Sequence, residues 1–165
     1  MLLAFGVVCA LLEAGTEGVI LTPSTPYDIS ASVARVSLAN VAIPESRVLE
    51  GITTDHVHQL FATLAAAEAA GVAEYTLTPA VEYAKIREQF GRTIGSFQSI
   101  KHRAADRLCR TEQVGVMASA AAVAAEDLGA ADSEPPVAAA VAGALAFGNA
   151  GRNSQDCIQI LGGIG

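Results

Sequence analysis

A short segment near the middle of the chain carries the residues with the clearest chemical potential. Residues 87–101 read Arg-Glu-Gln-Phe-Gly-Arg-Thr-Ile-Gly-Ser-Phe-Gln-Ser-Ile-Lys. An arginine at a helix end beside a glycine-containing loop presents a planar cation that can bind a phosphate through two hydrogen bonds, and Arg87 is placed in this way. Phe90 can offer its ring face to a heterocycle. The structural alternative is that Arg87 favours the negative end of a helix dipole and that Phe90 fills a core.

A second chemically suggestive segment closes the sequence. Residues 159–165 read Gln-Ile-Leu-Gly-Gly-Ile-Gly. Glycines let a backbone approach a pyrophosphate closely, and the side chain of Gln159 carries both a donor and an acceptor. The alternative is that Gly162 and Gly163 simply end a helix.

Other reactive side chains indicate no catalytic or metal site. His56 and His58 would point about 200° apart on a helix, so they cannot share a metal ion. The sequence has no phosphate-binding P-loop, no zinc-ligand spacing and no Ser-His-Asp pattern. We therefore predict no metal site.

Composition excludes several classes of protein. The net charge is −7, with 17 acidic and 10 basic residues, and no basic patch typical of nucleic-acid binding is present. The chain is 52% hydrophobic, yet no apolar stretch reaches the roughly 20 residues of a membrane-spanning helix. The three cysteines lie far apart and form no C-x-x-C motif, which favours reduced thiols and a cytoplasmic location.

The elements that would position these residues change in type near residue 52. The apolar run 2–12, the turn residues 13–18 and the segment 19–21 predict a β-hairpin, rather than a secretory signal at the N-terminus. Pro23 and Pro26 are expected to break strand pairing. Residues 33–43 predict a further strand that Pro44 ends.

After residue 51 the sequence predicts three long helices, the first capped by Thr53 or Thr54 and kinked at residues 75–78 by Pro79. Ser96 is expected to cap a second helix over residues 97–128, and Pro135 or Pro136 to begin a third that glycines 162 and 163 stop. Apolar residues recur at helical spacing in three groups: Val57, Leu60, Phe61, Leu64, Gly71, Val72, Tyr75, Tyr83 and Ile86; Phe97, Ile100, Ala104, Leu108, Thr111, Gly115, Ala118 and Ala122; and Val137, Val141, Leu145, Gly148 and Ile158. Short connections predict an antiparallel bundle with closely approaching helices and one open apolar groove for a fourth helix or a partner chain.

The pattern Tyr-x-x-x-Arg-x-Gln-Phe-Gly-Arg-x-Ile-x-x-Phe-Gln-x-Ile, which begins at Tyr83, resembles the start of the C-terminal helical domain of acyl-CoA dehydrogenases. The resemblance is clearest over residues 70–110. Residues 28–30 and 33–44 are similar to the end of the middle β-domain of that family, and residues 135–165 to its next helix and glycine turn. The resemblance implies an α+β fragment that is mainly α: part of the middle β-domain at 1–51, and an incomplete four-helix bundle at 52–165.

This resemblance also implies a cofactor and the residues that hold it. In the family, FAD lies partly across a subunit interface; the arginine matching Arg87 contacts the pyrophosphate, and the glutamine matching Gln98 contacts the same cofactor. The Gln-x-x-Gly-Gly element touches the diphosphate and ribitol region. The cofactor-binding residues implied here are Arg87, Phe90, Gln98, Gln159, Ile160, Leu161, Gly162 and Gly163.

The resemblance assigns no catalytic residue to this chain. In most members the glutamate that removes the α-proton of the thioester follows the glycine turn by some two dozen residues, beyond Gly165. In a minority it occupies the position of Phe61, and Glu68, two turns further along, is a weak substitute. We expect a fragment that lacks the first helical domain of the family and binds FAD weakly or not at all.

The activity that the resemblance implies is FAD-dependent α,β-dehydrogenation of an acyl-CoA thioester, with electron-transfer flavoprotein as acceptor and a homo- or heterotetramer as the assembly. Two alternatives stay open: a non-catalytic partner subunit that lends FAD contacts across an interface, and a relative on the same scaffold such as an acyl-CoA oxidase.

Overall fold

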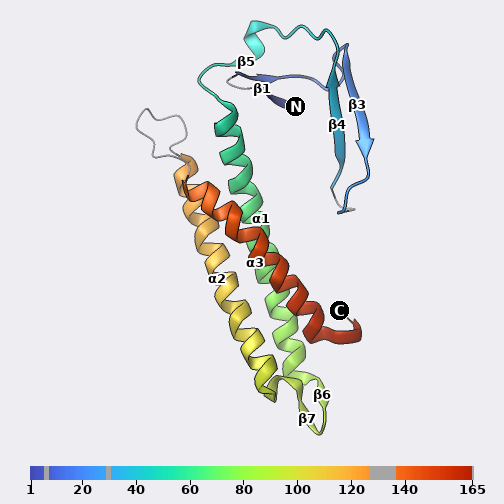
Figure 1. Cartoon of the computed structure of the whole chain (residues 1–165), viewed down its shortest axis with the longest axis vertical. Coiled ribbons are helices and arrows are strands. Elements are labelled where there is room, and N and C mark those ends of the chain that lie inside the picture. The colour runs from blue at the N-terminus through green and yellow to red at the C-terminus, as the bar shows by residue number, and fades with distance from the viewer. Residues whose placement is uncertain (6–7, 29–30, 127–136, 165) are drawn as a thin grey trace. The chain divides into compact units, whose positions relative to one another are not determined.

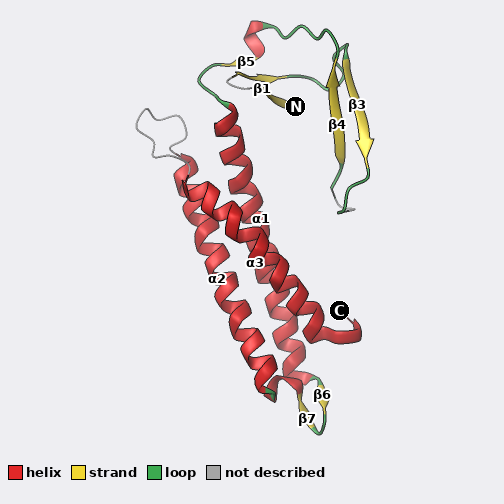
Figure 2. Ribbon diagram, viewed as in Figure 1, coloured by secondary structure: helices red, strands yellow, loops and turns green. Residues whose placement is uncertain are grey.

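The computed structural model describes residues 1–5, 8–28, 31–126 and 137–164. The chain folds as two compact units, Met1–Val57 and His58–Gly165 (Figure 1). Strands make up most of the first unit and helices most of the second (Figure 2). The predicted fold class, mainly α with a β segment ahead of three long helices, is confirmed, whereas the domain boundary at residues 51 and 52 stays a prediction.

Two small antiparallel sheets form the first unit. Strands β1 (Leu2–Phe5), β2 (Val8–Leu11) and β5 (Val48–Leu49) lie in the order β1-β2-β5. Strands β3 (Val19–Ser24) and β4 (Val33–Leu38) pair with each other over six residues. Between β4 and β5 lies a short 3₁₀ helix, Glu45–Arg47.

The predicted hairpin between residues 2–12 and 19–21 is wrong. The apolar run splits into β1 and β2, which pair with each other, with Leu2 opposite Leu11. Residues 13–18 do form a turn, in which the Thr16 N–H donates to the Glu13 carbonyl at 3.2 Å, but this turn connects two different sheets. An unbroken apolar run has no period, so its residue types cannot distinguish one strand from two.

Two further strand predictions are corrected. Pro23 does not break pairing, because it lies inside β3 opposite Ala34. Both strands of a two-stranded sheet are edge strands, and an edge tolerates the missing N–H of proline. The second predicted strand ends at Leu38 rather than Ile43, and Asn40 shortly after it has a left-handed backbone with φ of 53°.

The second unit contains α1 (Thr54–Ile86), α2 (Gln98–Glu126) and α3 (Val137–Leu161). Thr53 caps α1 as predicted: the His56 N–H donates to Thr53 Oγ1 at 3.4 Å, and the Thr53 N–H donates to His56 Nδ1 at 3.2 Å. Pro79 lies inside the continuous helix α1, and the kink there stays a prediction. Between α1 and α2 lie β6 (Glu88–Gln89), β7 (Arg92–Thr93) and a 3₁₀ turn, Ile94–Ser96.

Helix ends show one correction and one confirmation. The Ser96 hydroxyl does not cap α2, because it donates back to the Thr93 carbonyl at 2.7 Å, and the amides of Ile100 and Lys101 bond instead to the carbonyl of Phe97. At the other end of the unit, α3 stops before Gly162, whose φ is 66° and which begins the 3₁₀ turn Gly162–Ile164. The predicted start at Pro135 or Pro136 and the end of α2 near residue 128 lie outside the described residues.

The core of the helical unit is built from alanine. One cluster joins all three helices through Ala66, Ala69, Ala73, Val114, Ala118, Ala121, Ala142, Ala146 and Ala150. A second cluster nearer the β6–β7 turn contains Ala80, Ala84, Cys157 and Ile160, with Ile94, Ile100 and Leu161 packed against it. Small side chains let helix axes approach closely, as the abundance of alanine and glycine predicted.

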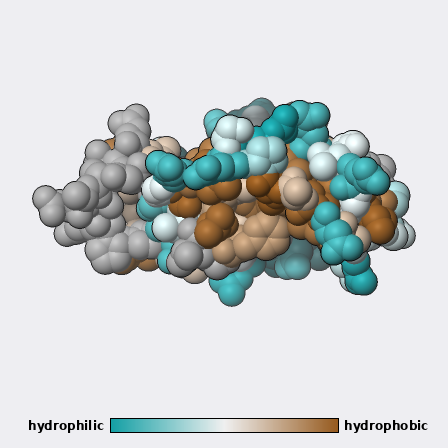
Figure 3. Space-filling model, turned by 90° about the horizontal axis from the view of Figure 1, so that it is seen from above, coloured by the Kyte–Doolittle hydropathy of each residue, from teal (hydrophilic) through white to brown (hydrophobic). Residues whose placement is uncertain are grey.

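Most of the predicted apolar stripe of α1 and all five positions named for α3 are exposed. Phe61 is 72% and Tyr75 77% exposed on α1, and Val137 is 62% exposed on α3. The buried faces of α1 and α3 consist mainly of alanine, so the larger apolar side chains of these two helices face outward. Hydrophobic side chains are correspondingly visible on the surface (Figure 3). Among the described helices, none is long and apolar enough to cross a membrane.

Candidate cofactor-binding site

Arg87 directly follows the end of α1, with its backbone fixed on both sides. The Arg87 N–H donates to the Tyr83 carbonyl at 2.9 Å, and the Arg87 carbonyl accepts the Ile94 N–H at 2.8 Å. Its guanidinium group is exposed and forms no hydrogen bond or ion pair with any described residue. A fixed backbone carrying an unpaired guanidinium is suited to binding an external anion.

A tight turn over residues 89–92 displays Phe90. Strands β6 and β7 pair Glu88 with Thr93 and Gln89 with Arg92. Phe90 and Gly91 have φ values of 56° and 73°, the two positive values of a type I′ turn. The left-handed conformation costs a residue such as phenylalanine about 1–2 kcal/mol, and the ring is 92% exposed. The suggestion that Phe90 fills a core is therefore wrong, and strain combined with exposure at one residue points to a functional role.

Next to this turn lies a small aromatic group that the sequence prediction did not include. The rings of Phe90 and Phe97 meet edge to face, with centroids 6.2 Å apart and planes at 88°. The guanidinium carbon Cζ of Arg92 lies 4.0 Å from the Phe97 ring centroid. Gln98 is the first residue of α2; its side chain is exposed, with Nε2 3.4 Å from His102 Nε2.

The residues predicted at the end of α3 separate into two groups. Ile160 is 4% exposed and Leu161 is half-buried, and both pack in the second cluster, so the Ile160 side chain lies in the core and not at the surface that carries Gln159. Gln159, Gly162 and Gly163 lie at the surface. A Cβ added to Gly162 or Gly163 would meet nothing within 4 Å. Nothing in the described chain thus crowds these glycines, and open space in front of the backbone suits the approach of a ligand.

Both predicted segments lie at the same end of the helical unit (Figure 1). Ile160 and Leu161 of α3 pack in the cluster that also contains Ile94 and Ile100, which flank residues 95–99. Tertiary packing therefore brings together segments about sixty residues apart in the sequence. Their cation, amide and open glycines are the donor types that a dinucleotide phosphate requires.

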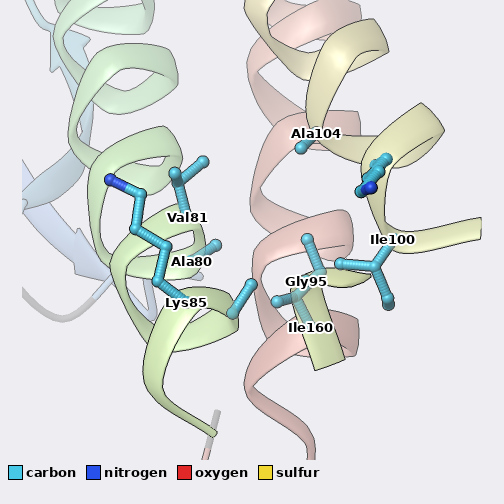
Figure 4. Close-up of a pocket in the computed structure, with 9 residues that line it drawn as sticks. Ala80, Val81, Lys85, Gly95, Ile100, Ala104 and Ile160 are labelled. Carbon is cyan, nitrogen blue, oxygen red and sulfur yellow. The ribbon is translucent and has the colours of Figure 1, made fainter. Parts of the chain in front are cut away.

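An apolar cavity of about 240 Å³ lies between the helices close to this end (Figure 4). Its lining comprises Ala80, Val81, Ala84, Lys85, Gly95, Ile100, Lys101, Ala104 and Ile160. Gly95 is required here, because an added Cβ would lie 2.7 Å from the Ala84 carbonyl oxygen. Of the predicted site residues only Ile160 lines the cavity, and Arg87 and Phe90 do not.

A partly buried polar network that the sequence prediction missed lies further along α2 and α3. Asp156 pairs with Arg103 through Oδ1 and with Arg110 through Oδ2, the latter at 2.7 Å. Arg107 is fully buried; its Nη2 donates to the Thr76 carbonyl, while its Nε and Nη1 have no partner among the described residues. Desolvation lowers the pKa of Arg107. Among the described residues, no group of His, Cys, Asp and Glu could hold a metal ion.

Comparison with known proteins places this arrangement in a family. Residues 60–165 match the family model described as acyl-CoA dehydrogenase, C-terminal domain. The chain is also 46% identical over 155 residues to acyl-CoA dehydrogenase FadE34 of Mycobacterium tuberculosis, covering 94% of this chain and 21% of that protein. The chain therefore belongs to the acyl-CoA dehydrogenase family, and it spans about a fifth of the length of this relative.

Solved structures share the fold. PigA with FAD and proline superposes with a TM-score of 0.77 at 26% identity, covering 94% of this chain and 42% of PigA. A chain of the ChsE4–ChsE5 complex from Mycobacterium tuberculosis superposes with a TM-score of 0.77 at 28% identity, covering 96% of this chain and 42% of that chain.

Proposed function

We propose that the chain supplies part of the FAD-binding surface of an acyl-CoA dehydrogenase. The observation that carries the proposal is the unpaired, exposed Arg87 beside the exposed ring of Phe90, at the same end of the bundle as the open glycines 162 and 163. The family membership and the FAD-bound structure of PigA support the choice of cofactor. The fit is chemical: a bidentate cation, an amide and uncrowded backbone suit a pyrophosphate, and a ring face suits a heterocycle.

In this proposal Arg87 holds the pyrophosphate, and Gln98 and Gln159 donate to neighbouring oxygen atoms of the cofactor. Gly162 and Gly163 admit the phosphate close to the backbone, while Ile160 and Leu161 anchor the end of α3 from within the core. When bound, FAD accepts the hydride removed from the β-carbon of an acyl-CoA thioester. The proposed acceptor of the electrons is electron-transfer flavoprotein, and the proposed location is the cytoplasm.

We assign the catalytic base to no residue of this chain. Phe61, at the position that carries the glutamate in a minority of the family, is apolar and exposed, and Glu68 on the same helix is exposed. A base with a pKa near working pH requires a buried carboxylate, and neither position provides one.

The second candidate is a partner subunit without chemistry of its own, which contributes Arg87 and Gln98 to a cofactor bound mainly by another chain. Phe61 in place of a glutamate is compatible with this candidate. The structural likeness to a chain of the ChsE4–ChsE5 complex favours a heteromeric arrangement, and a tetramer is the proposed assembly in either case.

The test is a titration of the isotope-labelled chain with FAD, followed by nuclear magnetic resonance because only part of the cofactor surface is present and we expect weak binding. The resonances of residues 87–98 and 159–163 should shift with FAD and with ADP, and much less with riboflavin, which has no phosphate. Arg87→Gln should raise the FAD concentration for half-saturation about tenfold, as expected when a charge-assisted bidentate contact is lost. Arg152→Gln, at an exposed arginine on α3, is the matched control. If Arg87→Gln leaves the FAD-induced shifts and the half-saturating FAD concentration unchanged, the proposal is contradicted.

A further inference from the structure

Arg92 makes a contact that the cofactor proposal does not use. Its guanidinium carbon stands 4.0 Å from the centroid of the Phe97 ring, and the group forms no hydrogen bond or ion pair within the described parts of the chain. Arginine stacks on aromatic faces through its planar, weakly hydrated cation. The stacking on Phe97 is therefore the polar-group contact that the structure gives for the Arg92 side chain within the described residues.

Phe97 is a firm anchor for this stack. Its N–H donates to the Ile94 carbonyl at 3.1 Å, and its carbonyl accepts the amides of Ile100 and Lys101, both at 3.1 Å. The backbone of Phe97 is thus fixed between the 3₁₀ turn and α2. The same ring also meets the Phe90 ring in an edge-to-face pair, with centroids 6.2 Å apart. One anchored ring consequently contacts the two side chains that flank Gly91.

The turn needs such support, because its own backbone supplies little. Strands β6 and β7 have two residues each, and an isolated hairpin of that length is unstable in water. Phe90 also holds a left-handed φ of 56°, which side chains of its size disfavour. Arg92 follows directly after the two left-handed residues, so fixing its side chain on Phe97 fixes the path by which the chain leaves the turn.

We propose that Arg92 is a positioning residue: stacked on Phe97, it holds the turn in the conformation that displays the ring of Phe90 to the heterocycle of a bound dinucleotide. The inference rests on the proposed function for its ligand, whereas its structural part concerns the turn alone. The competing role is a direct contact between the Arg92 cation and a phosphate, and the two roles predict different behaviour in paired substitutions.

The first measurement needs no ligand. In the labelled full chain, the side-chain protons of Arg92 should be shifted upfield by the Phe97 ring. Arg92→Met should move the Cα resonances of Phe90 and Gly91 away from left-handed values, and Arg92→Lys, which keeps a cation over the ring, should restore them in part. Arg152→Met is the control. Unchanged Phe90 and Gly91 resonances in Arg92→Met would overturn the proposal.

The second measurement titrates the same chains with FAD and reads the Phe90 ring resonances. Arg92→Met and Phe97→Leu should each raise the half-saturating FAD concentration about three- to fivefold. The double variant should need no more FAD for half-saturation than either single variant, because both substitutions remove the same contact. Phe97→Tyr keeps the ring and should behave as the unsubstituted chain, which separates loss of the stack from loss of folding. Additive losses would assign Arg92 to a phosphate and overturn the positioning role.

The two measurements also separate this inference from the proposed function. Suppose that Arg92→Met moves the Phe90 and Gly91 resonances but the unsubstituted chain shows no response to FAD. This result would support Arg92 as the residue that holds the turn. It would overturn the cofactor proposal and the part of the inference that concerns the ligand.

Discussion

At the scale of single residues, the helical unit holds arginine side chains in two different environments. Asp156 is 13% exposed and receives both Arg103 and Arg110, so its charge is compensated. Arg107 lies on the same helix and is fully buried, but two of its three nitrogen atoms have no partner among the described residues. A buried donor without a hydrogen-bond partner lowers the free energy of unfolding, whereas a donor that is paired with an acceptor does not carry this cost. Neighbouring arginines on one helix should therefore have opposite effects on stability.

Replacing Arg107 by methionine should stabilise the chain. The substitution keeps an unbranched side chain of similar length and removes a desolvated cation with unpaired N–H groups, so we expect the free energy of unfolding to rise by about 1 kcal/mol. Chemical denaturation monitored by circular dichroism measures it. Arg103→Met, which removes one partner of Asp156, should lower stability, and an equal loss in both variants would contradict this reading of Arg107.

Asp156→Asn should destabilise the chain in a pH-dependent way. Burial alone would raise the pKa of Asp156, but hydrogen bonds and charges from Arg103 and Arg110 outweigh it and lower the pKa below its ordinary value of 3.8. A lowered folded-state pKa contributes stability that is complete well above 3.8 and is lost as pH falls through the folded value. We expect a loss of about 1–2 kcal/mol at pH 7, shrinking toward zero in strong acid. Denaturation curves between pH 2 and pH 7 measure the difference, and a loss that is independent of pH would refute it.

At the scale of elements, the β6–β7 turn holds Phe90 in a strained, left-handed backbone conformation. The α2–α3 interface, by contrast, has little room for larger side chains. The turn places a phenylalanine where asparagine is the usual residue, with its ring almost fully exposed. The helix interface consists of alanines such as Ala142 and Ala146, both fully buried. Close packing explains the second feature, whereas the first is the one that the proposed ligand contact of Phe90 would explain.

Phe90→Asn should separate stability from binding. Asparagine tolerates the left-handed region and precedes glycine in preferred type I′ turns, so we expect about 1 kcal/mol of added stability. The FAD-induced shifts at Gly91 and Gln98 should weaken in the same variant, because no ring remains to meet the heterocycle. Thermal melts and the FAD titration measure the two effects, and a variant that binds FAD as well as the unsubstituted chain would exclude Phe90 as a ligand contact.

Ala146→Leu should destabilise the bundle by about 1–3 kcal/mol, because a well-packed interface must move to admit three more carbon atoms. Ala144→Leu, two residues away at an exposed position of α3, is the matched control and should change stability by no more than about 0.5 kcal/mol. Urea denaturation of both variants makes the comparison. Equal effects would show that α3 does not present the Ala146 face to the core.

At the scale of the whole molecule, the chain exposes more apolar surface than an isolated unit requires. Along α1, the large exposed side chains include Phe61, Leu64, Tyr75 and Ile86, and β3 and β4 have exposed residues on both faces. Contiguous exposed apolar surface marks regions that other protein surfaces cover. This agrees with a chain that spans about a fifth of the relative FadE34.

Exposed apolar residues on α1 should make the purified chain self-associate. We expect sedimentation velocity to detect concentration-dependent oligomers, and Phe61→Gln combined with Tyr75→Lys should shift the chain toward monomer because the stripe loses its two largest rings. Val116→Gln with Val123→Gln replaces two exposed valines on α2 as the control. If the control pair abolishes association equally, the contacts are not specific to α1.

Much of the architecture followed from local chemistry. The Thr53 cap, the stop at Gly162 and the turn at residues 13–18 depend on hydrogen bonds and backbone angles within a few residues, so residue types suffice to predict them. The motif around Arg87 likewise identified the family that residues 60–165 match. The roles of the cofactor residues stay predictions, because residue types alone do not establish a ligand contact.

The features that residue types did not predict depend on contacts between segments that are distant in the sequence. Whether residues 2–12 pair with each other or with residues 19–21 depends on the register of whole strands, and which apolar face of α1 is buried depends on how closely α2 and α3 approach. The burial of Arg107 depends in the same way on where separate helices meet. Local sequence thus determined the three helices, the Thr53 cap, the stop at Gly162 and the family. Tertiary packing decided how the first strands pair and which helix faces and cations are buried, because burial results from surfaces that only the folded chain brings together.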